Sequence, residues 1–215
     1  RGTPGGAWGA RYKRGKGKSG RGSGCGLGRA MRSSFADELR VIVDANGDYT
    51  LEHTDIFRRL DEFNLMMSEQ PLAGSMLEES AELQRQLRTP ICLDESLENL
   101  AAVERAIALG SLRIANIKIQ RVGGFGNALR ILDVCLAHKL GIWIGTMPEL
   151  GIGQAQGAAL SSHQGCNFPT DVEASARWFC DDIIAPWLEV AGGMIAMPTA
   201  PGLGTARRTH RFIAA

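Results

Sequence analysis

The chain of 215 residues is 44% hydrophobic and 22% charged, and its formal net charge is +1. This length can bury a core in one domain or at most two. No apolar run reaches the length of a transmembrane helix or resembles the apolar centre of a signal peptide, so we expect no membrane partner. Five widely spaced cysteines without a C-x-x-C pair argue against a zinc ribbon and a secreted disulfide framework, and they favour a reduced, cytoplasmic compartment.

The small net charge conceals an uneven distribution. Residues 1–36 hold nine basic side chains, eleven glycines and no acid, a charge of +9. The remaining residues hold fifteen basic and twenty-three acidic side chains, a charge of −8. Composition alone therefore predicts a flexible, basic, glycine-rich tail, of a kind that can bind RNA, ahead of an ordinary acidic enzyme domain.

From residue 40 onward the sequence repeats a regular pattern. Short apolar runs each end in a polar residue, and these residues are Asp44, Glu69, Asp94 and Lys118, separated by 25, 25 and 24 positions. Between the runs, apolar residues recur at helical spacing, as at Leu100, Val103 and Ile107. A further run ends at Gly145, and a weaker one occupies 166–170. The pattern predicts successive strand–helix units.

Such units build parallel sheets, either doubly wound or closed as a (β/α) barrel. The polar residue at the end of each run favours a TIM-type (β/α) barrel, because the C-terminal strand ends of a barrel meet at one mouth and supply the catalytic groups. We therefore expect three carboxylates and a lysine to face one another there.

One period before Asp44 lies the pair Lys16-Gly17-Lys18. In a strand, this spacing points both lysines to the same side. The surrounding glycines make a poor strand, however, so composition favours the flexible tail for this segment.

Three neighbouring carboxylates repel one another unless a cation joins them. Oxygen ligands of this kind suit Mg²⁺, with Mn²⁺ as the alternative, rather than zinc. A divalent ion opposite a lysine can support removal of a proton next to a carboxylate, because the metal stabilises the charge that develops.

Five segments resemble the successive strand-end motifs of the enolase superfamily: VDAN at 43–46, EQPL at 69–72, LDES at 93–96, NIKIQRVGG at 116–124 and GTMPELGIG at 145–153. PTAPGLG at 198–204 resembles its C-terminal segment. They are most similar to the muconate-lactonizing subgroup, and within it to the o-succinylbenzoate synthase and N-acylamino acid racemase family. The resemblance runs from about residue 39 to 204. It implies the modified (β/α)7β barrel of that superfamily.

The resemblance also implies roles for individual residues. Asp44, Glu69 and Asp94 would bind the metal, and Lys118 and Lys18 would be the acid–base lysines on opposite faces of the substrate. Lys16 would be an electrostatic neighbour of Lys18. Residues that would bind substrate or support the site are Asn46, Glu95, Gly145, Thr146, Met147 and Glu149. The last of these precede a helix whose N-terminus could receive a substrate anion.

The implied activity is metal-dependent removal of a proton alpha to a carboxylate in a small molecule. O-succinylbenzoate synthase, which dehydrates a cyclohexadiene carboxylate in menaquinone biosynthesis, is the first candidate. N-acylamino acid racemase and a muconate cycloisomerase-like enzyme are the alternatives, and a homo-oligomer stays open. Outside this class stand an inactive remnant and a nucleic-acid-associated protein that uses the basic arm; we do not expect nucleic acid.

Two parts of the family pattern are not visible in this sequence, namely the N-terminal capping domain and the first barrel strand. Residues 1–28 therefore resemble a fragment start, a misread frame or a degenerate sequence. We expect a poorly ordered or degenerate segment over 1–36, an enolase-type barrel domain over 37–204 and a basic tail over 205–215. Asp171 and Glu173, which follow the weak run at 166–170, are expected to be solvated or capping residues.

Overall fold

The computed structural model describes residues 14–20, 26 and 40–208. Most of the basic segment, Cys25 and residues 209–215 lie outside the described residues, so the expectations for them stay predictions. Within the described ranges, no helix combines the length and the apolar character needed to cross a membrane.

Six parallel strands form one sheet, in which the spatial order follows the chain order. They are β1 (Arg14–Lys18), β2 (Arg40–Asp44), β3 (Met67–Glu69), β4 (Ile91–Leu93), β5 (Ile114–Ile117) and β6 (Gly141–Ile144). Helices connect successive strands: α3 (Thr54–Leu60), flanked by η1 (Leu51–His53) and η2 (Asp61–Phe63), then α4 (Leu77–Gln86), α5 (Leu100–Leu109) and α6 (Phe125–Ala137). Helix α7 (Gly151–Ser161) follows β6.

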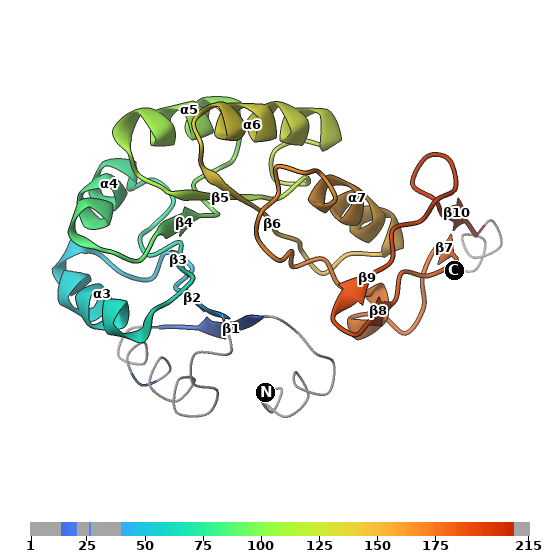
Figure 1. Ribbon diagram of the computed structural model, residues 1–215, viewed down its shortest axis with the longest axis horizontal. Coiled ribbons are helices and arrows are strands. Elements are labelled where there is room, and N and C mark those ends of the chain that lie inside the picture. Colours follow the sequence, from blue (N-terminus) through green and yellow to red (C-terminus); the bar gives the residue numbers. More distant parts are fainter. Residues whose placement is uncertain (1–13, 21–25, 27–39, 209–215) are drawn as a thin grey trace, which may run out of the picture.

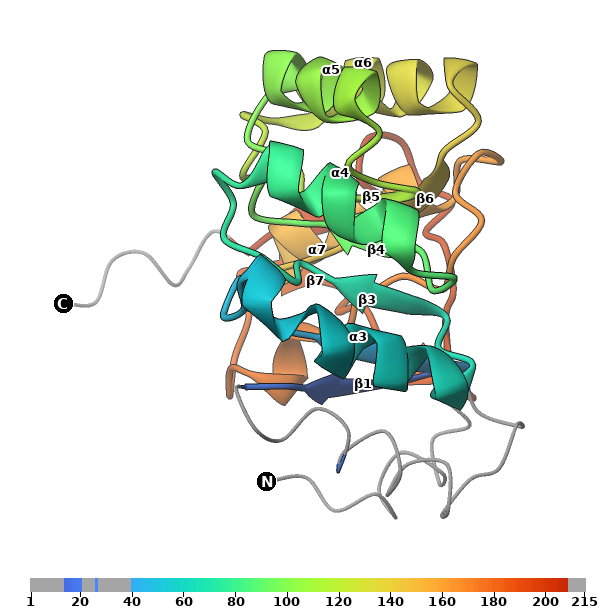
Figure 2. The same ribbon diagram turned by 90° about the vertical axis from the view of Figure 1, so that its left-hand side faces the viewer.

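The sheet curls into an arc, with α3, α4, α5 and α6 along its outer side (Figure 1). Figure 2 views the arc from outside, with α3 and α4 in front of β1, β3 and β4. A curled parallel sheet with helices outside is the architecture of a (β/α) barrel, so the predicted fold class is confirmed.

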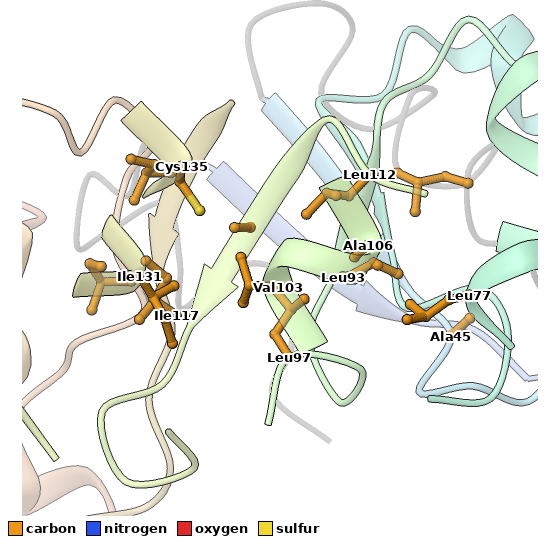
Figure 3. Packing of buried hydrophobic residues seen from close by; sticks show 14 of the residues in the cluster. Ala45, Leu77, Leu93, Leu97, Val103, Ala106, Leu112, Ile117, Ile131 and Cys135 are labelled. Carbon is orange, nitrogen blue, oxygen red and sulfur yellow. The ribbon is translucent and has the colours of Figure 1, made fainter. Parts of the chain in front are cut away.

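The strands bury side chains on both faces. Outward-facing residues such as Val43, Leu93 and Ile117 pack against the helices in one large cluster with Leu83 and Val103. Figure 3 shows Leu93, Val103 and Ile117 within this cluster. Inward-facing residues form a separate cluster, which we call the floor: Ile42, Met67, Cys92, Ile114 and Trp143. Because side chains alternate along a strand, the residue two positions after a floor residue also faces inward.

The composition-based expectation of a poor strand at Lys16 is wrong for Arg14–Lys18. This segment is β1, and it pairs along its whole length with β2, from Arg14 opposite Arg40 to Lys18 opposite Asp44. Strand propensity is a weak preference, and pairing with a buried neighbour overrides it. The two glycines cost ordering entropy, but β2 offers a full ladder and one acidic partner, Asp44, for both lysines.

The weak run at 166–170 is not a strand, which corrects the prediction. It follows the edge of β6 through side-chain hydrogen bonds instead: Asn167 accepts from the Ile142 amide at 3.0 Å, and the Thr170 hydroxyl donates to the Ile144 carbonyl at 2.8 Å. Pro169 between them has no amide hydrogen for a ladder. Beyond it, η3 (Ser175–Arg177) precedes two small antiparallel pairs, β7 (Ile184–Ala185) with β10 (Ala206–Arg207) and β8 (Val190–Ala191) with β9 (Met194–Ile195).

Candidate active site

Four chemically active side chains lie at one end of the sheet. Asp44 and Glu69 are the last residues of β2 and β3, and Asp94 and Lys118 directly follow β4 and β5. Each stands two positions after an inward-facing residue, and the first three follow the floor residues Ile42, Met67 and Cys92. Since neighbouring strands are parallel, the four side chains gather at the same mouth.

Lys16 lies at the centre of this acidic group. Its Nζ is 2.6 Å from Glu69 Oε2, 3.0 Å from Asp44 Oδ2 and 3.7 Å from Asp171 Oδ2. The same amine lies 5.0 Å from the ring centroid of buried Trp143. Lys16 therefore joins the ends of β2 and β3 to the segment after β6.

Lys18 lies at the more open side of the mouth, where 65% of its side chain is exposed. Its Nζ contacts Asp44 Oδ2 at 2.5 Å and donates to Asn46 Oδ1 at 2.7 Å. The Asn46 amide group in turn donates to Glu95 Oε1 at 3.0 Å. Asn46 and Glu95 thus connect Lys18 to the loop after β4.

Asp94 has cationic partners of its own. Lys118 Nζ lies 2.7 Å from Asp94 Oδ2, and the Arg121 guanidinium pairs with Asp94 Oδ1. The side chains of Asp94 and Lys118 are only 1% and 11% exposed. The mouth therefore holds two ion-pair groups side by side, one around Lys16 and one around Asp94.

Burial and mutual repulsion shift the titration of these groups. Burial raises the pKa of Glu69 to about 7 even though Lys16 opposes it, and the neighbouring charges of Asp44 and Asp94 add to the rise. Burial alone would raise the pKa of Asp44 and lower that of Lys16. The attraction between opposite charges reverses both effects, so the pKa of Asp44 lies below its usual value and that of Lys16 above. Lys16 therefore stabilises the charged form of Asp44 but does not offset the burial of Glu69.

Asn116, two positions before Lys118, is a buried polar residue of the interior. Its Nδ2 donates to Glu69 Oε1 at 3.1 Å. A Cβ at Gly145 would come within 2.1 Å of Asn116 Oδ1, so only glycine fits beside this amide at the end of β6. Gly145, predicted to bind substrate or support the site, therefore lies against a residue that holds Glu69.

The loop after β6 forms the remaining wall. Glu149 accepts hydrogen bonds from the Met147 amide at 3.3 Å and the Thr146 hydroxyl at 3.5 Å, and also from the Gln120 side chain. Burial raises the pKa of Glu149, although these hydrogen bonds oppose the rise. The first amide of α7, at Gly151, donates to both carboxylate oxygens of Asp182 at 3.0 Å. The expectation that the start of this helix receives a substrate anion is therefore wrong for that amide, because the chain caps it with its own carboxylate.

The sequence interpretation missed three residues of the mouth. Arg121 lies within the NIKIQRVGG segment but was given no role, and the two-residue alternation before Lys118 would have placed Asn116 inside the barrel. Asp171, expected to be solvated or capping, is instead within ion-pair distance of Lys16. No spacing rule reveals that contact, because an irregular segment brings Asp171 to the mouth.

The donor set suits a divalent cation. Asp44, Glu69 and Asp94 are at most 1% exposed, and their side chains supply only oxygen ligands. The ammonium group of Lys16 already lies between the carboxylates of Asp44 and Glu69. In the described part of the chain, however, no three acidic, histidine or cysteine side chains converge on one point. Asp94 is paired instead with Lys118 and Arg121.

A family model described as enolase C-terminal domain-like matches residues 10–210. The chain is 46% identical over 176 residues to o-succinylbenzoate synthase of Geobacillus stearothermophilus, an alignment covering 82% of this chain and 47% of that protein. It is 45% identical over 178 residues to N-succinylamino acid racemase of Amycolatopsis sp, covering 83% and 48%. The chain thus spans about half the length of the curated relatives it matches.

Solved structures agree with this relationship. An enolase superfamily member from Listeria innocua superposes with a TM-score of 0.90 at 36% identity, covering 94% of this chain and 54% of that one. Muconate cycloisomerase from Pseudomonas fluorescens superposes with a TM-score of 0.86 at 25% identity, covering 92% and 56%. In both cases nearly all of this chain matches about half of a longer protein.

Proposed function

Because this chain belongs to the enolase C-terminal domain-like family, we propose that it carries the acid–base and metal-binding part of an enzyme that removes a proton alpha to a carboxylate. O-succinylbenzoate synthase, a dehydratase acting in menaquinone biosynthesis, is the first candidate, since four of the curated relatives at 40% identity or above have that name. The observation that carries the proposal is the row of charged residues at or directly after successive strand ends, from Lys18 to Lys118. A cytoplasmic location accords with the free thiols of the four described cysteines.

In this proposal, Asp44, Glu69 and Asp94 hold Mg²⁺. The ion, when bound, would hold the substrate carboxylate and stabilise the negative charge that develops on it. Asn116 keeps Glu69 in place through its hydrogen bond, and Lys16 balances the charge of Asp44 and Glu69. Asn46 and Glu95 orient Lys18 from the open side.

The two lysines divide the proton transfer between them. Lys118 stands after β5 and Lys18 ends β1, so their amines approach the mouth from strands that are well separated in the sheet. One amine takes the proton from the α-carbon, and the other stabilises the charge or returns a proton on the opposite face. The nearly buried position of Lys118 suits the base, because little water competes for its amine.

N-succinylamino acid racemase is the second candidate. Its support is the 45% identical relative of that name, together with the presence of two lysines, which inversion at a carbon requires as donor and acceptor. Dehydration needs only one base. The two activities therefore differ in their dependence on Lys18.

Proton exchange in D₂O tests the proposal. The chain is incubated with Mg²⁺ and either an N-succinylamino acid or the cyclohexadiene carboxylate. NMR follows deuterium uptake at the α-carbon and formation of o-succinylbenzoate, and optical rotation follows inversion. Lys118→Ala should abolish inversion and slow o-succinylbenzoate formation by about 10²–10⁴-fold, the usual contribution of a positioned general base. Lys18→Ala should abolish inversion but only slow dehydration.

Lys139→Ala is the matched control, because Lys139 lies between α6 and the start of β6, at the end of the sheet opposite to the mouth. It should leave both reactions unchanged. Absence of metal-dependent exchange in the unmodified chain would support the inactive remnant instead.

A further inference from the structure

Gln70, which directly follows Glu69, is fully buried, and its side chain is bonded on every side. Its Nε2 donates to the Leu72 carbonyl at 2.7 Å and to Ser96 Oγ at 2.8 Å. Its Oε1 accepts from the Asp94 amide at 2.8 Å and from the Ser96 amide at 3.3 Å. One carboxamide thus satisfies four partners, three of which belong to the segment that follows β4.

The backbone of Gln70 extends the same connection. Its amide donates to the Cys92 carbonyl at 2.8 Å, and its carbonyl accepts from the Gly47 amide at 2.7 Å. Gln70 therefore contacts the chain after β2 and the chain after β4, while being covalently attached to Glu69. These contacts lie where regular pairing between β3 and β4 has ended.

The backbone conformation of Gln70 is unfavourable. Its φ is +36°, in the left-handed region that side-chain-bearing residues avoid, and it precedes Pro71, whose ring further restricts it. Such conformations persist where the surroundings impose them, and they cluster at functional sites. Glycine at position 70 would relieve the backbone strain, but it would also remove the side-chain carboxamide and its four hydrogen bonds. The contacts of the side chain therefore account for a glutamine in this conformation.

We infer that Gln70 is a positioning residue that sets the distance between Glu69 and Asp94, and so holds two of the three proposed metal ligands ready for the ion. This inference rests on the proposed function. Gln70 touches neither carboxylate group; it acts on Glu69 through the peptide bond between them and on Asp94 through its backbone amide. Loss of residues that orient metal ligands typically weakens metal affinity by about 10–100-fold.

The chain offers a matched control in Gln84. This second buried glutamine accepts from the Ile91 amide at 2.6 Å and donates to the Thr89 carbonyl at 3.3 Å. It therefore supports the first residue of β4, whereas Gln70 supports the residue after the last. Replacing either glutamine removes a buried carboxamide that accepts a backbone hydrogen bond at one end of β4, but only Gln70 lies beside the proposed ligands.

The test compares Gln70→Met, Gln70→Asn and Gln84→Met in the 215-residue chain. Asparagine tolerates the left-handed region and keeps an amide that is one methylene too short, so it provides a variant that folds even if methionine does not. The first readout, without metal, is hydrogen exchange of the Asp94 backbone amide by NMR. Exchange should accelerate at least tenfold in both Gln70 variants and stay unchanged in Gln84→Met.

The second readout is Mn²⁺ binding by calorimetry. Affinity should fall about 10–100-fold in both Gln70 variants and less than twofold in Gln84→Met. Unchanged Asp94 exchange in the Gln70 variants, or an equal loss of Mn²⁺ affinity at both glutamines, would overturn the inference. If the unmodified chain binds no Mn²⁺ while Asp94 exchange still accelerates, the hold of Gln70 on Asp94 stands and the proposed metal function fails.

Discussion

At the scale of single residues, Glu69 shows how the site concentrates charge. It is completely buried and accepts a hydrogen bond from Asn116. Burial raises its pKa to about 7, and the charges of Asp44 and Asp94 add to the rise although Lys16 opposes it. A metal ion at this position would replace repulsion by attraction. The charged form of Glu69 therefore destabilises the folded chain when no metal ion is bound. Its titration should be visible in the free energy of unfolding of the metal-free chain.

We expect the free energy of unfolding of the metal-free chain to fall as pH rises from about 4.5 to about 7. Between the usual pKa of 4.5 and the raised value, folded Glu69 binds more protons than unfolded Glu69, so each increment of pH favours unfolding. The effect is at most about 3 kcal/mol. Urea denaturation across this range should show it, and Glu69→Gln should remove it.

Glu62→Gln, at an exposed position of η2, serves as the control and should retain the full pH dependence. The opposite trend, with stability rising between pH 5 and 7 through Glu69, would contradict the raised pKa. Such a result would also weaken the case for a cation at this position.

At the scale of elements, β1 depends on contacts that composition does not reveal. Tyr49 is 2% exposed, and its ring packs edge-on against Phe57 with centroids 5.1 Å apart. Its hydroxyl donates to the Gly20 carbonyl at 2.6 Å and lies 2.8 Å from the Ser19 hydroxyl. A residue in the loop after β2 thus anchors the end of β1 that carries Lys18.

Tyr49→Phe should therefore loosen β1 while leaving the ring packing intact. Loss of the hydroxyl contacts should lower the free energy of unfolding by about 1–2 kcal/mol. Limited trypsin digestion followed by mass spectrometry should show faster cleavage after Lys16 and Lys18. Ser111→Ala removes a buried hydroxyl bonded to Leu77 far from β1, and it should not accelerate that cleavage; equal acceleration in both would refute the anchoring role.

Strand ends at Asp44, Glu69, Asp94 and Lys118 could be predicted because period and polarity are local properties of the chain. The strand at Lys16 could not be predicted from its glycine-rich composition, because its stability comes from β2 and Tyr49. Contacts of Asp182 with α7 and of Gln70 with Asp94 join residues 24 or more positions apart, and no local pattern encodes them.

At the scale of the whole molecule, the chain matches nearly all of its length to about half of each relative. It contains both lysines and all three carboxylates of the proposed site. Those groups differ in how firmly they are held, because Lys118 is nearly buried whereas Lys18 extends from a five-residue strand with two glycines.

We accordingly expect the 215-residue chain to bind Mn²⁺ but to turn over slowly. Catalytic groups need to be held to about 0.5 Å, and Lys18 is 65% exposed and extends from a strand with two glycines. Steady-state rates of o-succinylbenzoate formation, measured beside the full-length synthase of Geobacillus stearothermophilus, test this expectation. Comparable rates would mean that Lys18 is held firmly enough despite its exposure.

The alternation between floor and mouth has a consequence for how errors in assembly are detected. Each acidic residue stands two positions after an apolar floor residue, as Asp44 follows Ile42. A strand that paired one residue out of step would turn its carboxylate into the apolar helix layer and its core residue toward the mouth, and an unpaired charge buried there is strongly unfavourable. Misregistered molecules would therefore lose their ligands and their core together. A titration of metal-binding capacity would therefore measure the correctly folded fraction of a preparation, because only correctly paired strands place their carboxylates at the mouth.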